Sequence, residues 1–239
     1  MPFVRANGID ICYELYGEGE HLLVIGGLAI DLTQLKGIVD ELSGNYQVIA
    51  FDNRGVGRTD KPHEPYSIEM MAEDAAGLVN ALGMKSVNVL GISMGGRIAI
   101  SLTLQHPELV KSLILVSTSA RTHKYGRGLE WSLSNFLLRI PAVRKIGTKY
   151  PQPYYAYVRQ REASRNYDAT NRLQEIRVPT LIIHGKKDRI APFSLAEELR
   201  AHIEGSKLIA VEGGHLFAFT KQKDLIDLVT GFLQAQSSE

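Results

Sequence analysis

The chain has 239 residues, of which 44% are hydrophobic and 22% are charged, and its formal net charge at pH 7 is +1. This composition is that of a globular protein with a sizeable core, and the balanced charge gives no electrostatic reason to expect a nucleic-acid binder or a polybasic membrane protein. The single cysteine, Cys12, excludes an internal disulfide and a cysteine-built zinc site. No apolar run near the N-terminus approaches the roughly 20 residues of a membrane span, and the first ten residues lack an apolar signal core, so we expect a cytoplasmic protein.

A predicted hairpin opens the chain, because Phe3–Arg5 and Ile9–Tyr16 flank Ala6-Asn7-Gly8 and both Asn and Gly tolerate a positive φ. Short, nearly continuous apolar runs follow, a pattern typical of strands buried on both faces. These runs are Leu22–Ile25, Tyr46–Phe51, Ser86–Leu90, Leu113–Val116, Thr180–Ile183 and Lys207–Val211.

Segments with helical spacing lie between most of these runs. They are Leu32–Leu42, Ile68–Leu82, Met94–Gln105, Leu195–Ile203 and Leu225–Leu233. The alternation predicts an α/β fold, with a mostly parallel eight-stranded sheet and helices on both of its faces.

Residues 121–172 interrupt this alternation, with no clear strand, three prolines and the only tryptophan. We expect one domain overall, in which 1–120 and 173–239 form the core and 121–172 form a short helical lid over the strand ends. The lid has a net charge of +8, so the remainder has −7. This basic lid is either a solvated face or, through Arg159, Arg161 and Arg165 on one helical surface, a guide for an acidic carrier protein or a coenzyme A thioester.

A serine lies at a predicted turn from strand to helix. Gly91-Ile92-Ser93-Met94-Gly95 matches the pattern G-x-S-x-G between the strand Ser86–Leu90 and the helix Met94–Gln105. Small neighbours are needed there because the turn is sharp and the backbone segments must approach closely. We expect Ser93 to be a nucleophile and the N–H of Met94 to face an oxyanion formed on the substrate.

Asp188 and His215 follow the predicted strands Thr180–Ile183 and Lys207–Val211. Together with Ser93 they fall just beyond the carboxyl ends of parallel strands, where an open α/β sheet gathers its site. A serine hydroxyl needs a base, and the base needs an orienting carboxylate. We therefore predict that Ser93, His215 and Asp188 are catalytic, and that the amide of Leu28, after the third strand, is the second oxyanion donor.

Together these motifs resemble the serine-triad type of the α/β-hydrolase superfamily, over essentially the whole chain. The order Ser, Asp, His along the chain is the order of that family's triad. The matching segments are Gly26-Gly27-Leu28, Asp52–Asp60, Gly91–Gly96, Val178–Asp188 and Gly213-Gly214-His215. The resemblance implies the α/β-hydrolase fold with a small lid.

Two positions depart from relatives in that superfamily. Gly26 stands where the family usually has a histidine that commonly braces the oxyanion loop, which puts the rigidity of this loop in question. Relatives that open epoxides or displace halide carry aspartate where this chain has Ser93, which argues against both activities.

The implied chemistry is acyl transfer through an acyl-enzyme, with no metal or organic cofactor. The resemblance makes a carboxylic ester the default substrate, and the small lid favours a short or medium acyl chain. A thioester or a lactone would pass through the same intermediate, so both stay open. A non-catalytic small-molecule receptor on the same fold is the hypothesis from a different class, and a lyase or perhydrolase is a third.

Apolar side chains from lid and body are expected to line an acyl pocket. The predicted substrate-binding residues are Gly27, Trp131, Phe136, Tyr155, Ile190 and Leu216. The other six histidines lack metal-ligand spacing and are predicted to be structural, with His184 supporting the Asp188 loop. Gly55-Val56-Gly57 lacks the rest of a phosphate-loop motif and is predicted to lie in a structural loop in which Arg54 ties neighbouring backbone together.

Overall fold

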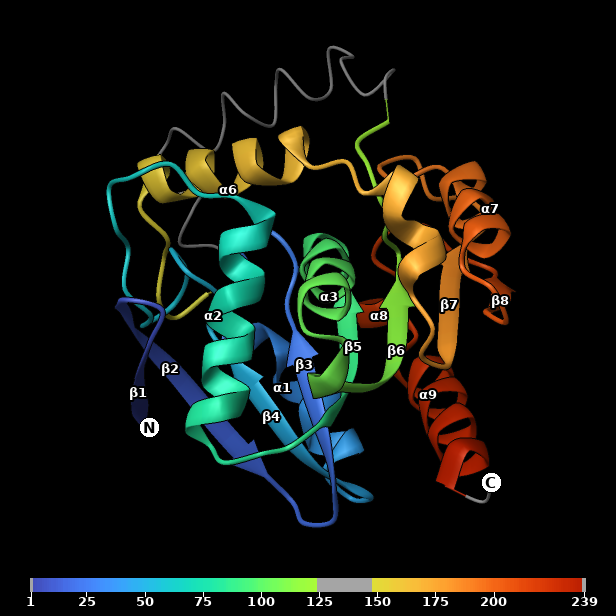
Figure 1. The fold of residues 1–239 in the computed structure, drawn as a ribbon, viewed down its shortest axis with the longest axis horizontal. Coiled ribbons are helices and arrows are strands. Elements are labelled where there is room, and N and C mark those ends of the chain that lie inside the picture. The colour runs from blue at the N-terminus through green and yellow to red at the C-terminus, as the bar shows by residue number, and fades with distance from the viewer. Residues whose placement is uncertain (1, 124–147, 238–239) are drawn as a thin grey trace.

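The structure is a computed structural model that describes residues 2–123 and 148–237 (Figure 1). Its centre is one eight-stranded sheet in the order β1-β2-β4-β3-β5-β6-β7-β8. The strands are β1 (Phe3–Ala6), β2 (Ile9–Tyr16), β3 (Glu20–Ile25), β4 (Tyr46–Phe51), β5 (Val87–Ile92), β6 (Val110–Val116), β7 (Thr180–Gly185) and β8 (Lys207–Val211).

The two N-terminal strands form the predicted hairpin. Ala6 pairs with Ile9, and the two residues between them have positive φ angles, 46° at Asn7 and 78° at Gly8. Strand β2 then pairs antiparallel with β4, and every later pairing in the sheet is parallel. The expected mostly parallel eight-stranded sheet is confirmed.

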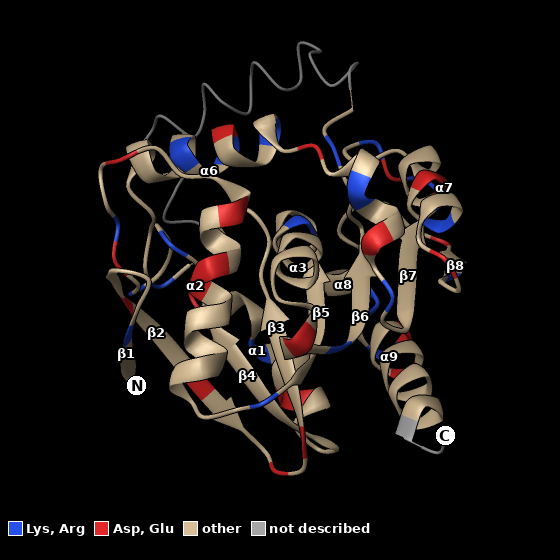
Figure 2. Ribbon diagram, in the orientation of Figure 1, with Lys and Arg blue, Asp and Glu red and all other residues tan. Residues whose placement is uncertain are grey.

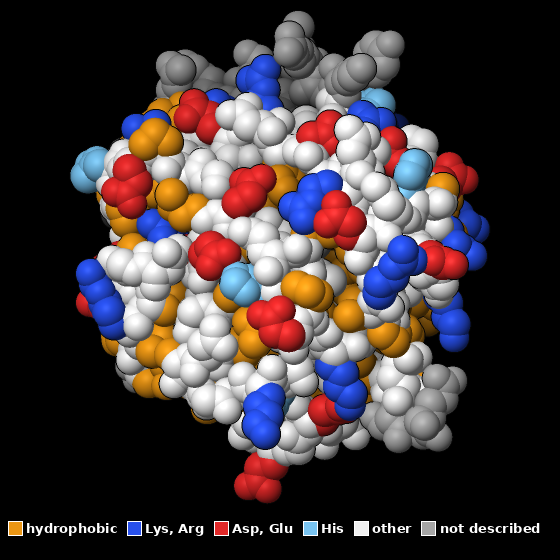
Figure 3. Space-filling model, in the orientation of Figure 1, with side chains coloured by type: hydrophobic (Ala, Val, Ile, Leu, Met, Phe, Trp, Pro, Cys, Tyr) orange, Lys and Arg blue, Asp and Glu red, His pale blue; other side chains and the backbone are white. Residues whose placement is uncertain are grey.

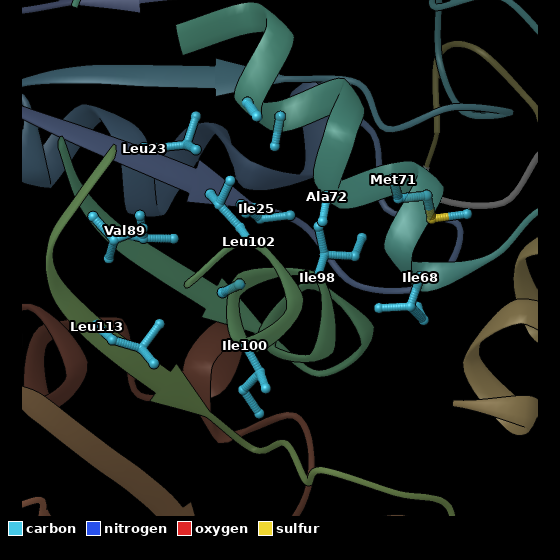
Figure 4. Packing of buried hydrophobic residues seen from close by; sticks show 14 of the residues in the cluster. Leu23, Ile25, Ile68, Met71, Ala72, Val89, Ile98, Ile100, Leu102 and Leu113 are labelled. Atoms are coloured by element: carbon cyan, nitrogen blue, oxygen red, sulfur yellow. The ribbon is translucent and has the colours of Figure 1, made fainter. Parts of the chain in front are cut away.

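Successive residues of the central strands enter two separate cores. Leu23 and Ile25 of β3 pack in one hydrophobic cluster, whereas Leu22 and Val24 pack in the other. Figure 4 shows the first cluster, in which side chains of β3, β5 and β6 meet the helices α2 (Ile68–Ala81) and α3 (Met94–Gln105). Because both faces are buried, these strands read as continuous apolar runs in the sequence.

Helices cover both faces of the sheet, as expected. Residues of α2, α3 and α7 (Phe193–His202) belong to the first cluster. Residues of α1 (Leu32–Leu42), α8 (Phe217–Thr220) and α9 (Gln222–Ser237) belong to the second. No helix in the described part of the chain is long and apolar enough to cross a membrane.

The chain between β6 and β7 contains the helix α6 (Tyr154–Asn166) and a 3-10 helix (Thr170–Glu175). Figure 1 shows α6 lying across the carboxyl ends of the parallel strands. Its buried residues, which are Ala156, Tyr157, Gln160 and Ala163, form one helical stripe that faces the body of the protein. The fold is therefore an α/β sandwich with an inserted helical element above the end of the sheet where the candidate residues gather.

Several observed elements differ from the predicted ones. Strand β5 continues through Gly91 to Ile92, because Gly91 pairs with Ile25 of β3 and Leu115 of β6 instead of ending the strand. The helix α9 begins three residues before its predicted start, and α8 was not predicted. The face in Figure 3 carries Lys, Arg, Asp and Glu side chains scattered among hydrophobic ones.

Candidate active site

Ser93 occupies a strained turn between β5 and α3. Its φ is 57° and its ψ is −117°, a backbone conformation that residues other than glycine seldom adopt. The surrounding backbone holds this geometry, since Ser93 N–H donates to Val116 O at 2.9 Å and Thr118 Oγ1 donates to Ser93 O at 2.6 Å. The turn therefore places Ser93 just beyond the carboxyl end of β5.

Glycines make this turn possible by close backbone approach. A Cβ at Gly91 would lie 2.5 Å from Gly95 O, and a Cβ at Gly95 would collide with the carbonyl oxygen of Ile25. The expected need for small neighbours around Ser93 thus has a direct steric cause.

Three side chains from three strand ends form one hydrogen-bond chain. Ser93 Oγ lies 2.9 Å from His215 Nε2, and His215 Nδ1 lies 2.8 Å from Asp188 Oδ2. With Nδ1 protonated, His215 donates to the carboxylate and its Nε2 accepts from the serine hydroxyl. The imidazole is 13% exposed, while the carboxylate is buried. This series of hydrogen bonds therefore leads from the solvent side into the protein.

The loop after β7 keeps Asp188 ionised. Burial raises the pKa of this carboxyl, but hydrogen bonds from His184 and His215, the charge of His215 and the N–H of Ala191 together hold it well below its ordinary value. Oδ1 accepts from the N–H groups of Ile190 and Ala191, each at 2.8 Å. The expected support from His184 is present, because its Nε2 donates to Ala191 O at 2.7 Å and lies 3.4 Å from Asp188 Oδ2.

The two segments predicted to supply oxyanion donors lie beside Ser93. Met94 is the first residue of α3, so its N–H has no acceptor within the helix and lies at the positive end of the helix dipole. The loop after β3 passes close to the nucleophile, since a Cβ at Gly27 would lie 3.3 Å from Ser93 Cβ. This approach brings the Leu28 segment beside the serine.

The oxyanion loop is braced although Gly26 replaces the family's usual histidine. Asn53 Nδ2 donates to Gly26 O at 2.9 Å, and Ile30 N–H donates to Gly27 O at 3.2 Å. Asp52, fully buried, accepts from Leu32 N–H at 2.8 Å. The loop therefore takes its rigidity from its neighbours in the body.

The predicted pocket residues fall into three groups. Gly27 lies beside Ser93, and Ile190 and Leu216, next to Asp188 and His215 in their loops, are 57% and 60% exposed at the rim of the site. Tyr155 is held against another loop, since its hydroxyl donates to Lys61 O at 2.7 Å and its ring stacks on His63. Trp131 and Phe136 lie outside the described residues.

Sequence reasoning did not identify every side chain that shapes the site. Thr118, which holds the Ser93 carbonyl, follows β6 in a short polar run that carries no other signal. Gln160 on α6 contacts Ala29 beside the oxyanion loop, and nothing in the sequence pattern points to it. In the described part of the chain, no group of three or more His, Cys, Asp or Glu side chains could hold a metal ion.

The sequence profile of the alpha/beta hydrolase fold matches residues 20–145, more than half of the chain. The protein is a member of this family. In an α/β hydrolase of the serine type, the catalytic serine, acid and histidine follow one another along the chain in that order, which is also the order of Ser93, Asp188 and His215.

Curated relatives of this α/β hydrolase cover almost its whole length. A putative carbamate hydrolase of Azorhizobium caulinodans is 26% identical, over 97% of this chain and 98% of that protein. A 2-hydroxy-6-oxo-2,4-heptadienoate hydrolase of Pseudomonas putida is also 26% identical, over 98% and 96%. Both relatives are named as hydrolases, but their named substrates differ. They therefore support hydrolase activity in general.

A solved esterase from Exiguobacterium antarcticum superimposes with a TM-score of 0.84 at 26% identity, over 97% of this chain and 98% of that one. An enol-lactonase from Burkholderia xenovorans, 24% identical with a TM-score of 0.83 over 98% and 100%, shares the fold. The α/β-hydrolase fold expected from the sequence is confirmed.

Proposed function

We propose that this α/β hydrolase is a serine hydrolase that cleaves a carboxylic ester with a short or medium acyl chain. The observation that carries the proposal is the continuous chain of two hydrogen bonds, 2.9 Å and 2.8 Å, from Ser93 through His215 to Asp188. Such a chain supplies a nucleophile, a general base and an orienting carboxylate in one place.

In the proposed mechanism, His215 Nε2 takes the Ser93 proton as Oγ attacks the ester carbonyl carbon. The N–H groups of Met94 and Leu28 donate to the oxyanion, and Asp188 stabilises the imidazolium. His215 then gives its proton to the leaving alcohol, and an acyl-enzyme remains on Ser93. Water attacks this ester by the reverse proton path and releases the acid.

The exposed apolar side chains of Ile190 and Leu216 support an acyl group as the occupant of the rim. Trp131, Phe136 and Tyr155 remain proposed contributions of the lid. The proposed small-molecule ester needs no cofactor, and we place the reaction in the cytoplasm on the sequence alone.

The alternative is a thioesterase or carrier-protein-linked ester hydrolase that uses the basic lid. In the described part of the lid, α6 carries three arginines and one glutamate (Figure 2). Arg121 pairs with Glu198 at 3.0 Å, and Arg159 lies 3.9 Å from Glu162. These pairs neutralise part of the charge, and the remaining excess of arginine on α6 is the observation that keeps an anionic partner as the alternative.

The proposal is tested by initial hydrolysis rates on p-nitrophenyl esters from acetyl to palmitoyl, with wild type and Ser93→Ala side by side. We expect a maximum at a short or medium chain and loss of activity in the variant, by a factor of about 10⁴ or more. An acyl-coenzyme A, a lactone and a carbamate complete the panel.

Each other outcome of this panel points to a named alternative. A preference for the thioester would favour the basic-lid hypothesis, and a preference for the lactone or the carbamate would move the substrate class. No activity above Ser93→Ala on any substrate would overturn the proposal and favour the receptor hypothesis.

A further inference from the structure

Gln160 is a fully buried amide in the middle of the inserted helix. It lies on the inward stripe of α6 between Ala156 and Ala163, and it has no solvent exposure. The other buried residues of α6 are Ala156, Tyr157 and Ala163, whose atoms are mostly apolar, so hydrophobic packing does not explain a glutamine there. A buried amide is retained at low energetic cost only where its polar atoms are bonded.

The hydrogen bonds of Gln160 join α6 to two loops of the body. Its Oε1 accepts from Ala29 N–H at 3.2 Å, and its Nε2 donates to Arg54 O at 2.8 Å. Gln152, which precedes the helix, also donates to Gln160 Oε1, at 3.0 Å. One side chain thus connects the insertion with the loop after β3 and the loop after β4.

The bond to Ala29 completes the bracing of the oxyanion loop. The Gly26–Gly27 peptide is held by Asn53, and the Gly27–Leu28 peptide by Ile30 N–H. The Leu28–Ala29 peptide is held by Gln160. The bonds from Ile30 and to Gln160 fix the two peptide planes that flank the Leu28 Cα atom and leave the N–H of Leu28 unused by them.

Ala29 also needs outside support for its backbone. Its φ is 61°, in the left-handed region that L residues adopt only at a cost. The acceptor that Gln160 offers to Ala29 N–H stabilises this conformation from the insertion side. The body alone supplies no such bond to this peptide among the described contacts.

We propose that Gln160 is a positioning residue through which α6 sets the geometry of the Leu28 oxyanion donor. This inference rests on the proposed function, in which the Leu28 N–H donates to the oxyanion. Because an oxyanion exists only after Ser93 has attacked, a displaced donor lowers kcat and changes KM little. The insertion then takes part in turnover as well as in covering the site.

The test compares Gln160→Met, which keeps the side-chain length and removes the amide, with Thr122→Val. Thr122 is a matched control, since its hydroxyl also joins α6 to the body, through Ser164 O at 3.2 Å and Arg97 at 3.0 Å, and its described bonds reach neither Gln160 nor the oxyanion loop. We expect Gln160→Met to lower kcat about tenfold to hundredfold, the range for a misplaced oxyanion donor, and Thr122→Val to leave kcat near wild type.

A second readout reports the oxyanion site directly. A trifluoromethyl ketone adds to the nucleophilic serine and presents an oxyanion, so its inhibition constant should weaken in Gln160→Met by about the same factor as kcat. Thermal unfolding of each variant controls for loss of fold.

Gln160→Glu tests the role without removing the polar group. A protonated carboxyl has both an acceptor and a donor and can replace the amide, whereas the carboxylate has no donor for Arg54 O. Burial raises the pKa of such a carboxyl. We expect the ratio of variant to wild-type kcat to be highest at acidic pH and to fall as the pH rises.

The outcomes separate this inference from the proposed function. A wild-type protein with no turnover above that of Ser93→Ala would overturn both the inference and the proposed function. Ser93-dependent turnover in wild type with an unchanged kcat and inhibitor affinity in folded Gln160→Met would overturn the inference alone. Equal losses in Thr122→Val, or a pH-independent ratio in Gln160→Glu, would likewise reduce Gln160 to a structural part of the insertion.

Discussion

At the scale of single residues, the candidate site depends on backbone conformations that few side chains tolerate. Ser93 and Ala29 both have positive φ angles, and each is held by a hydrogen bond from another segment, Thr118 for Ser93 and Gln160 for Ala29. The proposed nucleophile and the proposed oxyanion loop are therefore preorganised by contacts whose residues lie far from them in the sequence.

Asp188→Asn tests the acid of the proposed triad. The amide keeps the shape of the side chain but favours the wrong tautomer of His215, so we expect kcat to fall by about 10⁴ while the fold is retained. Steady-state kinetics with circular dichroism as the folding control measures this. A variant with near wild-type kcat would remove Asp188 from the mechanism.

The same variant has a defined effect on the pH dependence of stability. Because the folded pKa of Asp188 is depressed, its ionised form stabilises the protein above the unfolded value, about 3.9, and this contribution is lost as the pH falls through the folded pKa. The difference in unfolding free energy between wild type and Asp188→Asn should stay constant from pH 8 to about 5 and shrink below about 4. A difference that shrinks already near neutral pH would contradict the assigned direction of the shift.

At the scale of elements, a buried ion pair joins the hairpin, the loop after β4 and α2. Arg54 contacts Asp74 through two nitrogen atoms, at 2.8 and 2.6 Å, and Asn7 donates to the same carboxylate at 2.8 Å. Arg54 also reaches Asn7 O at 3.4 Å, so it ties neighbouring backbone as its sequence context suggested. This network positions the loop whose Arg54 carbonyl accepts from Gln160.

Asp74→Ala is predicted to destabilise the fold by about 3–5 kcal/mol, because it leaves the guanidinium of Arg54 buried without its partner. Urea unfolding measures this cost. The double variant Arg54→Met/Asp74→Leu should recover much of the loss, since no uncompensated charge remains. A loss below about 1 kcal/mol in Asp74→Ala would show that solvent reaches the pair.

The elements that the sequence predicted are those with strong apolar periodicity or a turn motif. Strand β4, helix α1 and helix α3 have the predicted bounds. Strand β5 extends beyond its predicted end because Gly91 pairs with Ile25 of β3. Helix α6 could not be delimited, since its buried stripe, with two alanines, a tyrosine and a glutamine, lacks a repeat of large apolar residues. Helix α8, with four residues, is too short to show a period.

Sequence motifs located some residues of the candidate site and missed others. Ser93, Asp188 and His215 stand at strand ends and in short motifs, so they could be located in the sequence. The bonds of Thr118 to Ser93 and of Gln160 to Ala29 join positions 25 and 131 residues apart. Contacts at such separations depend on how the elements pack, and single-sequence patterns do not encode them.

At the scale of the whole molecule, near-neutral net charge conceals a basic insertion on an acidic body. Part of this asymmetry is neutralised across the boundary, where Arg121 between β6 and α6 pairs with Glu198 of α7. Arg97 of α3 is partly buried and donates to Ser119 and Thr122 and to the Ser164 carbonyl of α6. Its burial lowers the pKa of the guanidinium to about 10, a cost consistent with a role in fixing the insertion on the body.

The central claim is that the fold activates Ser93 as a nucleophile, and covalent labelling tests it most directly. A fluorophosphonate should label the wild-type protein stoichiometrically. Mass spectrometry of the modified peptide should place the adduct on Ser93. Ser93→Ala should take up no label, and His215→Ala should react far more slowly because it lacks the base. Failure of the wild type to react, or equal labelling of His215→Ala, would contradict the account.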